Sequence, residues 1–198
     1  MIEKYTLNNG IPVFIVESHA SPVVSIQAWV QRGSAYESES LAGISHFLEH
    51  ALFKGTRNRK VGEIAKEIES RGGEVNAFTS FEETAYYATL ASRYFEEGLD
   101  VIADTVQNPS FDPGEMTREK EVILEEIKRA FDSPSKMVST NLWKTCYAGT
   151  PYGRPVLGFE DTVKKIDAKK LKTYFDKNYN AGTMSLFIVG DISTEKAL

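Results

Sequence analysis

The chain has 198 residues, of which 41% are hydrophobic and 26% are charged, values near the globular average that exclude wholesale disorder. A net charge of −5 argues against a nucleic-acid or acidic-membrane partner, and no apolar run reaches the roughly eighteen residues of a membrane helix. The single cysteine, Cys146, excludes an internal disulfide framework and a cysteine-rich zinc site. Because the N-terminus lacks the apolar core of a signal peptide, we expect a cytoplasmic chain, or a mitochondrial-matrix or periplasmic one if a targeting segment has been removed.

The first part of the chain predicts strands and then helices. Strands are expected over residues 4–7 and 11–17, on either side of the hairpin turn signal at residues 8–10, and over residues 23–31. Ser40 is then expected to cap a helix that continues to Lys54, because apolar residues recur at every third or fourth position. A second helix fits residues 61–70.

The remaining elements mix strands and helices without regular alternation. This mixture predicts an α+β fold with a largely antiparallel sheet packed against helices. In chain order we expect strand character over 74–91, helices over 92–107, 113–131 and 135–147, a loop over 149–158, short helices over 160–165 and 168–177, and a strand over 184–189.

The end of the sequence predicts the beginning of one more helix. Ser193 or Thr194 is expected to cap it, and only residues 195–198 follow. A helix this short is not stable by itself, so we expect the sequence to be part of a longer chain.

Two of the three histidines, His46 and His50, lie four residues apart on the first predicted helix, with Glu49 between them. At about 100° per residue, the three side chains project within an arc of roughly 100°. Two imidazoles one turn apart can bind one metal ion, and a carboxylate beside them can contact a water molecule that the metal activates. The pattern therefore predicts a zinc hydrolysis site, the alternative being two histidines near the core and a surface glutamate. The third histidine, His19, is expected to be solvated in a turn.

Zinc requires a third protein ligand. Cys146 is one candidate, but a lone cysteine on an apolar helix is typical of a small buried hydrophobe. On the long acidic helix, Glu126 has mostly apolar neighbours three and four residues away, whereas Glu125 has charged neighbours and a favourable pair to Arg129. Glu126 is therefore the expected ligand, and Glu119, on nearly the same face, can accept a hydrogen bond from a ligand histidine. A solvated acidic face is the alternative for both.

The surroundings of the histidine pair resemble the pitrilysin family of metallopeptidases. Residues 46–50 are the inverted zinc motif H-x-x-E-H. The resemblance is closest to the branch that contains mitochondrial processing peptidase and its bacterial relatives, and it runs from about Tyr5 to Asp191. Further matching segments are residues 42–45, 51–56, 73–80, 84–87, 121–126 and 151–155.

This resemblance implies specific roles for the site residues. It implies that one Zn²⁺ per chain is bound by His46, His50 and Glu126. Glu49 is then the general base, and Glu119 is the carboxylate behind the ligands. The implied reaction is the hydrolysis of unfolded or extended peptides by a zinc metalloendopeptidase.

The resemblance also implies where a peptide binds. Asn76, Ala77 and Phe78 correspond to the family's active-site strand, which takes up the substrate as an added extended strand. Taken without the resemblance, Asn76 reads as an ordinary turn or edge residue.

Family enzymes consist of two homologous halves, and this sequence corresponds to the first. Residues 1–191 would form the zinc-bearing N-terminal half and residues 192–198 the start of a truncated helix. The implied partner is a homologous C-terminal half or a partner subunit. Without it we expect self-association through the uncovered surface and weak or absent activity.

Two other functions stay open at this point. The first is an inactive structural subunit of the same family, although such subunits generally lose zinc ligands. The second is an enzyme like S-ribosylhomocysteine lyase, which also carries H-x-x-E-H. That chemistry uses cysteine both as a ligand and in catalysis, and Cys146 cannot fill both roles.

Overall fold

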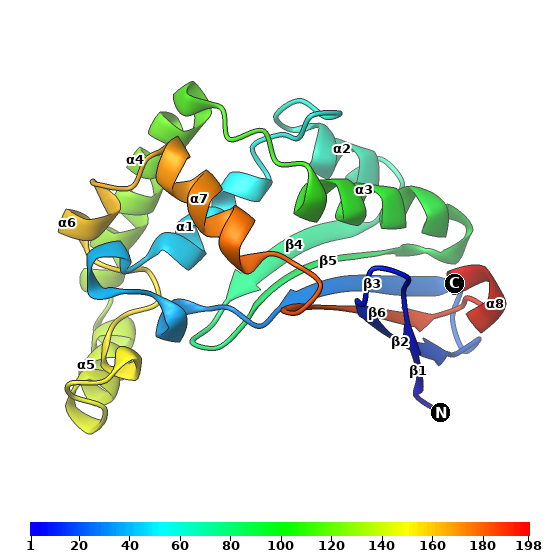
Figure 1. The fold of residues 1–198 in the computed structure, drawn as a ribbon, viewed down its shortest axis with the longest axis horizontal. Helices are drawn as coiled ribbons and strands as arrows, with labels where there is room; N and C mark the ends of the chain where they lie inside the picture. Colours follow the sequence, from blue (N-terminus) through cyan, green and yellow to red (C-terminus); the bar gives the residue numbers. More distant parts are fainter.

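The fold is built on one six-stranded sheet with helices against one face (Figure 1). The computed structural model describes residues 1–198. The strand order is β1-β2-β6-β3-β5-β4; β2 and β6 are parallel, and every other neighbouring pair is antiparallel. This confirms the predicted α+β fold. The strands are β1 (Glu3–Thr6), β2 (Pro12–Glu17), β3 (Val23–Val30), β4 (Glu74–Thr79), β5 (Thr84–Ala91) and β6 (Met184–Gly190).

Some helices cover the sheet and others lie outside it. Figure 1 shows α2 and α3 lying along the sheet, whereas α4, α5 and α6 lie beyond one end of it. No helix has the length and the apolar composition required to cross a membrane. The helices are α1 (Ile44–Leu52), α2 (Glu63–Glu69), α3 (Phe95–Gln107), α4 (Pro113–Phe131), α5 (Pro134–Cys146), α6 (Glu160–Val163), α7 (Ala168–Asn178) and α8 (Thr194–Ala197).

The core lies between the sheet and the helices that cover it. On β3, Val24, Ile26, Ala28 and Val30 are buried and alternate with more exposed residues, as expected for a strand with one covered face. The apolar side of α1, including Leu48, packs into the same cluster. Burial of that side fixes the orientation of α1, and hence the direction of its polar side chains.

Helix α1 begins later than predicted. Ser40 lies in a short 3₁₀ turn, Glu39–Leu41, and α1 starts at Ile44 after Gly43, whose φ of 94° lies in the left-handed region. The cap is the buried carboxylate of Glu37, which accepts hydrogen bonds from the backbone N–H groups of Gly43 at 2.8 Å and Ser45 at 2.7 Å. A carboxylate at a helix N-terminus satisfies unpaired amides and opposes the helix dipole, which a serine hydroxyl does less well.

His19 is solvated, as predicted, but it also makes two contacts that the sequence did not predict. Its ring is exposed, but its two nitrogens contact carboxylates, Asp191 at 2.5 Å and Glu17 at 2.7 Å. The hydrogen bonds to Asp191 and then to Glu17 raise the pKa of His19. His19 therefore links the ends of β2 and β6.

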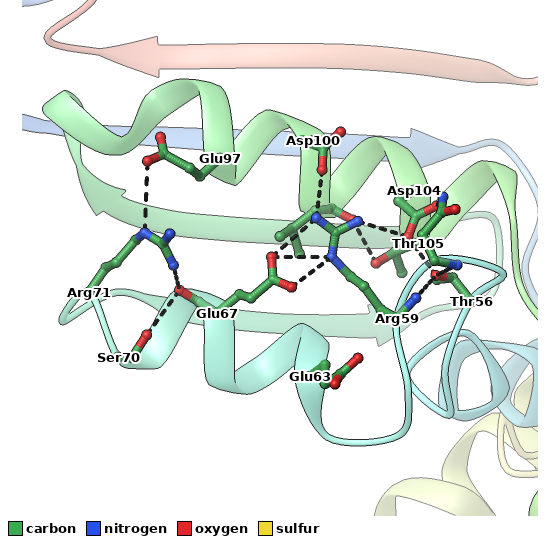
Figure 2. Close-up of polar contacts among 12 residues, drawn as sticks. Thr56, Arg59, Glu63, Glu67, Ser70, Arg71, Glu97, Asp100, Asp104 and Thr105 are labelled. Atoms are coloured by element: carbon green, nitrogen blue, oxygen red, sulfur yellow. Dashed lines mark hydrogen bonds and ion pairs between the residues drawn. The ribbon is translucent and has the colours of Figure 1, made fainter.

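A charged network ties the loop after α1 to α2 and α3 (Figure 2). The guanidinium of Arg59 donates hydrogen bonds to Asp104 at 2.8 Å, Asp100 at 2.5 Å and Glu67 at 3.1 Å. The side chain of Asp104 is only 4% exposed, and it also accepts a 2.5 Å hydrogen bond from Thr56. Burial opposes ionisation of Asp104, but hydrogen bonds from Thr56, Arg59 and neighbouring amides outweigh it and lower its pKa.

Replacing Arg59 with Met should destabilise the fold, because Asp104 would remain buried without its cation. We expect a loss of about 3 kcal/mol in the free energy of unfolding near neutral pH. The stabilisation from a carboxyl with a lowered pKa is present above its unfolded pKa of 3.8 and is lost as the pH falls through its folded pKa. The cost of Arg59→Met should therefore shrink in acid. Urea denaturation followed by tryptophan fluorescence measures both effects.

Arg57 provides the matched control, because it is an exposed arginine of the same loop. Arg57→Met should change the free energy of unfolding by less than about 0.5 kcal/mol. Similar losses for the two variants would show that the Arg59 network does not stabilise the fold.

Candidate metal centre

Helices α1 and α4 bring two histidines and one glutamate together. His46 and His50 project from α1, and Glu126 projects from α4, which packs against α1. One carboxylate oxygen of Glu126 lies 3.6 Å from Nε2 of His46 and 3.8 Å from Nε2 of His50. One candidate ligand atom from each residue lies within 4.8 Å of the other two. The structure therefore gathers the three residues that the sequence singled out.

Glu119 orients His50 from behind. Its carboxylate accepts a 2.8 Å hydrogen bond from Nδ1 of His50, which leaves Nε2 directed at Glu126. The ammonium of Lys54 lies 2.7 Å from the other oxygen of Glu119. Burial opposes ionisation of Glu119, but hydrogen bonds from His50 and Lys54 outweigh it and lower its pKa. Burial likewise opposes protonation of His50, yet the bond to Glu119 and nearby negative charges raise the pKa of His50.

His46 is held as a neutral ring. Burial, followed by the nearby charge of His50, lowers the pKa of His46 to about 3. Its Nδ1 is buried without a hydrogen-bond partner. A neutral imidazole is the form in which histidine binds metal ions.

Glu49 lies beside the histidine pair and is held by β4. One of its oxygens accepts a 2.6 Å hydrogen bond from Oγ1 of Thr79. Burial raises the pKa of Glu49, while the bond from Thr79 opposes this shift. Glu49 is thus a partly desolvated carboxyl with a fixed orientation.

Strand β4 forms one edge of the sheet, since its only partner is β5. Asn76 and Phe78 are exposed, and Ala77 is half-buried on the face toward the helices. The side-chain oxygen of Asn76 accepts a 2.9 Å hydrogen bond from the backbone N–H of Ala77. The edge strand therefore lies next to Glu49, and one of its amides is bonded to a neighbouring side chain.

A cavity of about 490 Å³ lies beside this cluster and the edge strand. Its walls include His46, Glu49 and Glu126, residues 77–79 of β4, and the side of α5 that carries Trp143. His50, Glu119 and Asn76 are not part of its lining. The cavity gives a ligand access to the histidine–carboxylate cluster from the sheet edge.

Two expectations about the helices beyond the sheet were wrong. Cys146 is exposed, because α5 buries none of its side chains, and it is not among the residues of α5 that line the cavity. Glu125 is on a charged surface as predicted, but it pairs with Lys128 at 2.6 Å rather than with Arg129.

Sequence reasoning also missed Thr79, Lys54 and Glu37, which hold the site residues in position. Thr79 was accessible to pattern reasoning, because it shares the helix-facing side of β4 with Ala77. Lys54 and Glu37 have no such signal. The partner of Lys54 is Glu119 on α4, and Glu37 reaches the amide of Ser45 only through the course of a loop.

Comparison with known proteins gives consistent matches. The profile of the family described as "Insulinase (Peptidase family M16)" matches residues 13–160. The chain is 38% identical over 193 residues to the "Uncharacterized zinc protease YmxG" of Bacillus subtilis (strain 168), covering 98% of this chain and 47% of that protein. It is 36% identical over 193 residues to the "Probable mitochondrial-processing peptidase subunit beta, mitochondrial" of Arabidopsis thaliana, covering 98% of this chain and 36% of that protein.

A solved structure shares the fold. A protease from Helicobacter pylori superimposes with a TM-score of 0.94 at 30% sequence identity, over 99% of this chain and 48% of that chain. The chain thus spans about half the length, or less, of the proteins that it matches.

Replacing Glu119 with Gln should lower the pKa of His50 in the metal-free chain. Burial favours the neutral ring, and the negative charge of Glu119 is one of the effects that oppose it. An NMR titration of the His50 ring protons measures the shift. Glu115→Gln is the control, because Glu115 lies on the same helix but pairs with Arg118. An unchanged His50 pKa in the Glu119 variant would contradict the orienting contact.

Proposed function

The chain belongs to the insulinase family of peptidases, family M16, which confirms its resemblance to the pitrilysin-type metallopeptidases, and on this premise we propose that it carries the metal centre of a zinc metalloendopeptidase. Its substrates are unfolded or extended peptides. The observation that carries the proposal is the convergence of His46, His50 and Glu126 beside the carboxylate of Glu49.

The three converging residues fit zinc. The distances of 3.6 and 3.8 Å between the histidine Nε2 atoms and Glu126 exceed hydrogen-bond range. Zinc binds histidine and carboxylate ligands at about 2 Å, so atoms with these separations can share one ion. Neutral His46 offers a lone pair, and the bond from Nδ1 of His50 to Glu119 leaves Nε2 of His50 for the metal, which would displace the proton held there. The zinc ligands in this proposal are therefore His46, His50 and Glu126.

Glu49 performs the proton transfers. When bound, zinc acts as a Lewis acid that activates a water molecule and polarises the carbonyl of the scissile bond. Glu49 takes a proton from the attacking water and delivers it to the leaving amine. Its raised pKa suits a group that must both accept and release a proton. The hydrogen bond from Thr79 engages only one carboxylate oxygen of Glu49 and keeps the other available.

Strand β4 holds the peptide in this proposal. An extended peptide can add to the free edge of β4, with its backbone as the main source of affinity. A backbone carbonyl of the peptide would replace the side-chain oxygen of Asn76 as acceptor for the N–H of Ala77. The exposed ring of Phe78 would contact a substrate side chain beside the cavity. Only an unfolded or extended segment can present its backbone in this way.

A second half completes the enzyme in this proposal. The chain covers 47% of the Bacillus relative, and its cavity is lined by α5, on which Val138 and Leu142 are 70% and 61% exposed. A homologous half or partner subunit would cover this region and enclose the substrate. Closure would exclude water and strengthen the electrostatic interactions at the metal.

The alternative of an inactive subunit predicts no metal binding. The fold alone does not separate the two functions, but the complete set of ligands and the oriented Glu49 favour the enzyme. A lyase that needs cysteine at the metal finds no support, because Cys146 lies outside the cavity lining.

The purified chain should bind about one zinc ion, and Glu126→Gln should weaken its retention much more than Glu125→Gln does. Glu126 faces the histidines, whereas Glu125 is paired with Lys128 on the surface. Elemental analysis after dialysis measures retention. No zinc in the wild type, or equal losses in both variants, would refute the ligand assignment.

In the complete enzyme, Glu49→Gln should reduce peptide hydrolysis by at least about a hundredfold, because the amide cannot accept a proton. Zinc content should stay unchanged, since Glu49 is not a ligand in this proposal. A fluorogenic peptide assay with parallel metal analysis tests both parts. Retained activity would exclude Glu49 as the general base.

A further inference from the structure

Helix α5 presents one polar face to the cavity, and neither the zinc chemistry nor the strand edge uses it. Lys136, Thr140 and Trp143 line the cavity together with Ser139. Residues four and three positions apart lie on one side of an α-helix, so these side chains form a continuous wall. The wall carries an ammonium group near its N-terminal end, hydroxyls in the middle and an indole near its C-terminal end.

Lys136 brings an uncompensated positive charge to this wall. Its side chain is exposed and has neither an ion pair nor a side-chain hydrogen bond within the chain, unlike Lys128, which pairs with Glu125. The second cation of the lining, Arg154, donates to the backbone carbonyl oxygen of Glu37 at 2.8 Å and has no carboxylate partner within ion-pair distance. Lys136 therefore lacks an anionic partner, whereas the charge of Arg154 acts on the nearby buried carboxyl of Glu37.

The two carboxylates of the lining are engaged elsewhere. Glu49 is bonded to Thr79 at 2.6 Å, and Glu126 faces the histidines. Negative charge is thus concentrated at the metal cluster, and positive charge lies on the α5 wall and at Arg154. A ligand group that binds against α5 therefore meets hydrogen-bond donors without partners and no carboxylate on that wall.

We propose that Lys136 selects peptides with an aspartate or glutamate side chain at the position that reaches α5. This inference rests on the proposed peptidase function and specifies the substrate class of the same cavity. A carboxylate accepts hydrogen bonds from the ammonium and from the hydroxyls of Ser139 and Thr140. Trp143, whose ring lies 4.7 Å from that of Phe81, supplies an apolar flank for the methylene groups of the acidic residue.

The test compares the binding of labelled peptides that are identical except for Glu, Gln or Lys at one position, with that position moved along the peptide. Fluorescence anisotropy is measured on the zinc-loaded chain carrying Glu49→Gln, so that the peptides stay intact. We expect one position at which the Glu peptide binds about threefold more tightly than the Gln peptide at low ionic strength. The preference should vanish in about 1 M salt, where the screening length is about 3 Å.

Lys136→Glu should reverse the preference in favour of the Lys peptide. Lys144→Glu is the matched control, because Lys144 lies on the same helix outside the cavity lining and changes the net charge equally. Equal affinities for the Glu and Gln peptides at every position, no measurable binding, or an equal effect of the two variants would overturn the inference.

Hydrolysis of the same peptides by the complete wild-type enzyme is scored separately. A charge preference without cleavage would overturn the proposed peptidase function and leave the role of Lys136 supported. Cleavage without a charge preference would support the proposed peptidase function and overturn the role of Lys136.

Discussion

Three carboxylates surround two imidazoles at α1, and the resulting excess of negative charge is the constraint on which the site depends. Glu49, Glu119 and Glu126 all act electrostatically on His50, and burial followed by the charge of Glu126 raises the pKa of Glu49. Within the chain, Lys54 and His50 both lie within ion-pair distance of Glu119, and His50 also lies 3.8 Å from Glu126. Partly buried carboxylates are stable only with a compensating cation or proton. A divalent cation between the imidazoles and Glu126 is the compensation that the proposed function supplies.

The proposed ligands are held by structure outside their own cluster. The apolar side of α1 packs against the sheet, and Glu37 caps its N-terminus through the amides of Gly43 and Ser45. Beyond its C-terminus, the Arg59 network fixes the following loop to α3 (Figure 2). The helix that carries both histidines is therefore anchored at each end, and its imidazoles are oriented before any metal binds. Such preorganisation lowers the cost of ordering the ligands.

The cavity combines walls of different rigidity. Strand β4 is part of the sheet and holds Glu49 through Thr79, whereas α5 contributes its side chains to the cavity without burying any of them. A change on β4 or α1 disturbs the core and the chemistry together. A change on the exposed wall of α5 alters the charge that a substrate meets and leaves the core intact. The proposed division assigns catalysis to the packed elements and substrate selection to α5.

The sequence by itself determined the features that depend on local periodicity. The spacing of His46 and His50 follows from the helical repeat, and the apolar neighbours of Glu126 separated it correctly from Glu125, which lies on the charged surface. Only the tertiary structure decided which groups hold the side chains of the site in place. Glu37 reaches α1 through a loop, and Thr79 contacts Glu49 from a strand 30 residues away. Cys146 was misjudged for the same reason, since its exposure depends on where α5 lies relative to the core. Periodicity fixes the direction of a side chain on its own element, but its partner depends on how separate elements pack, and no local pattern encodes that arrangement.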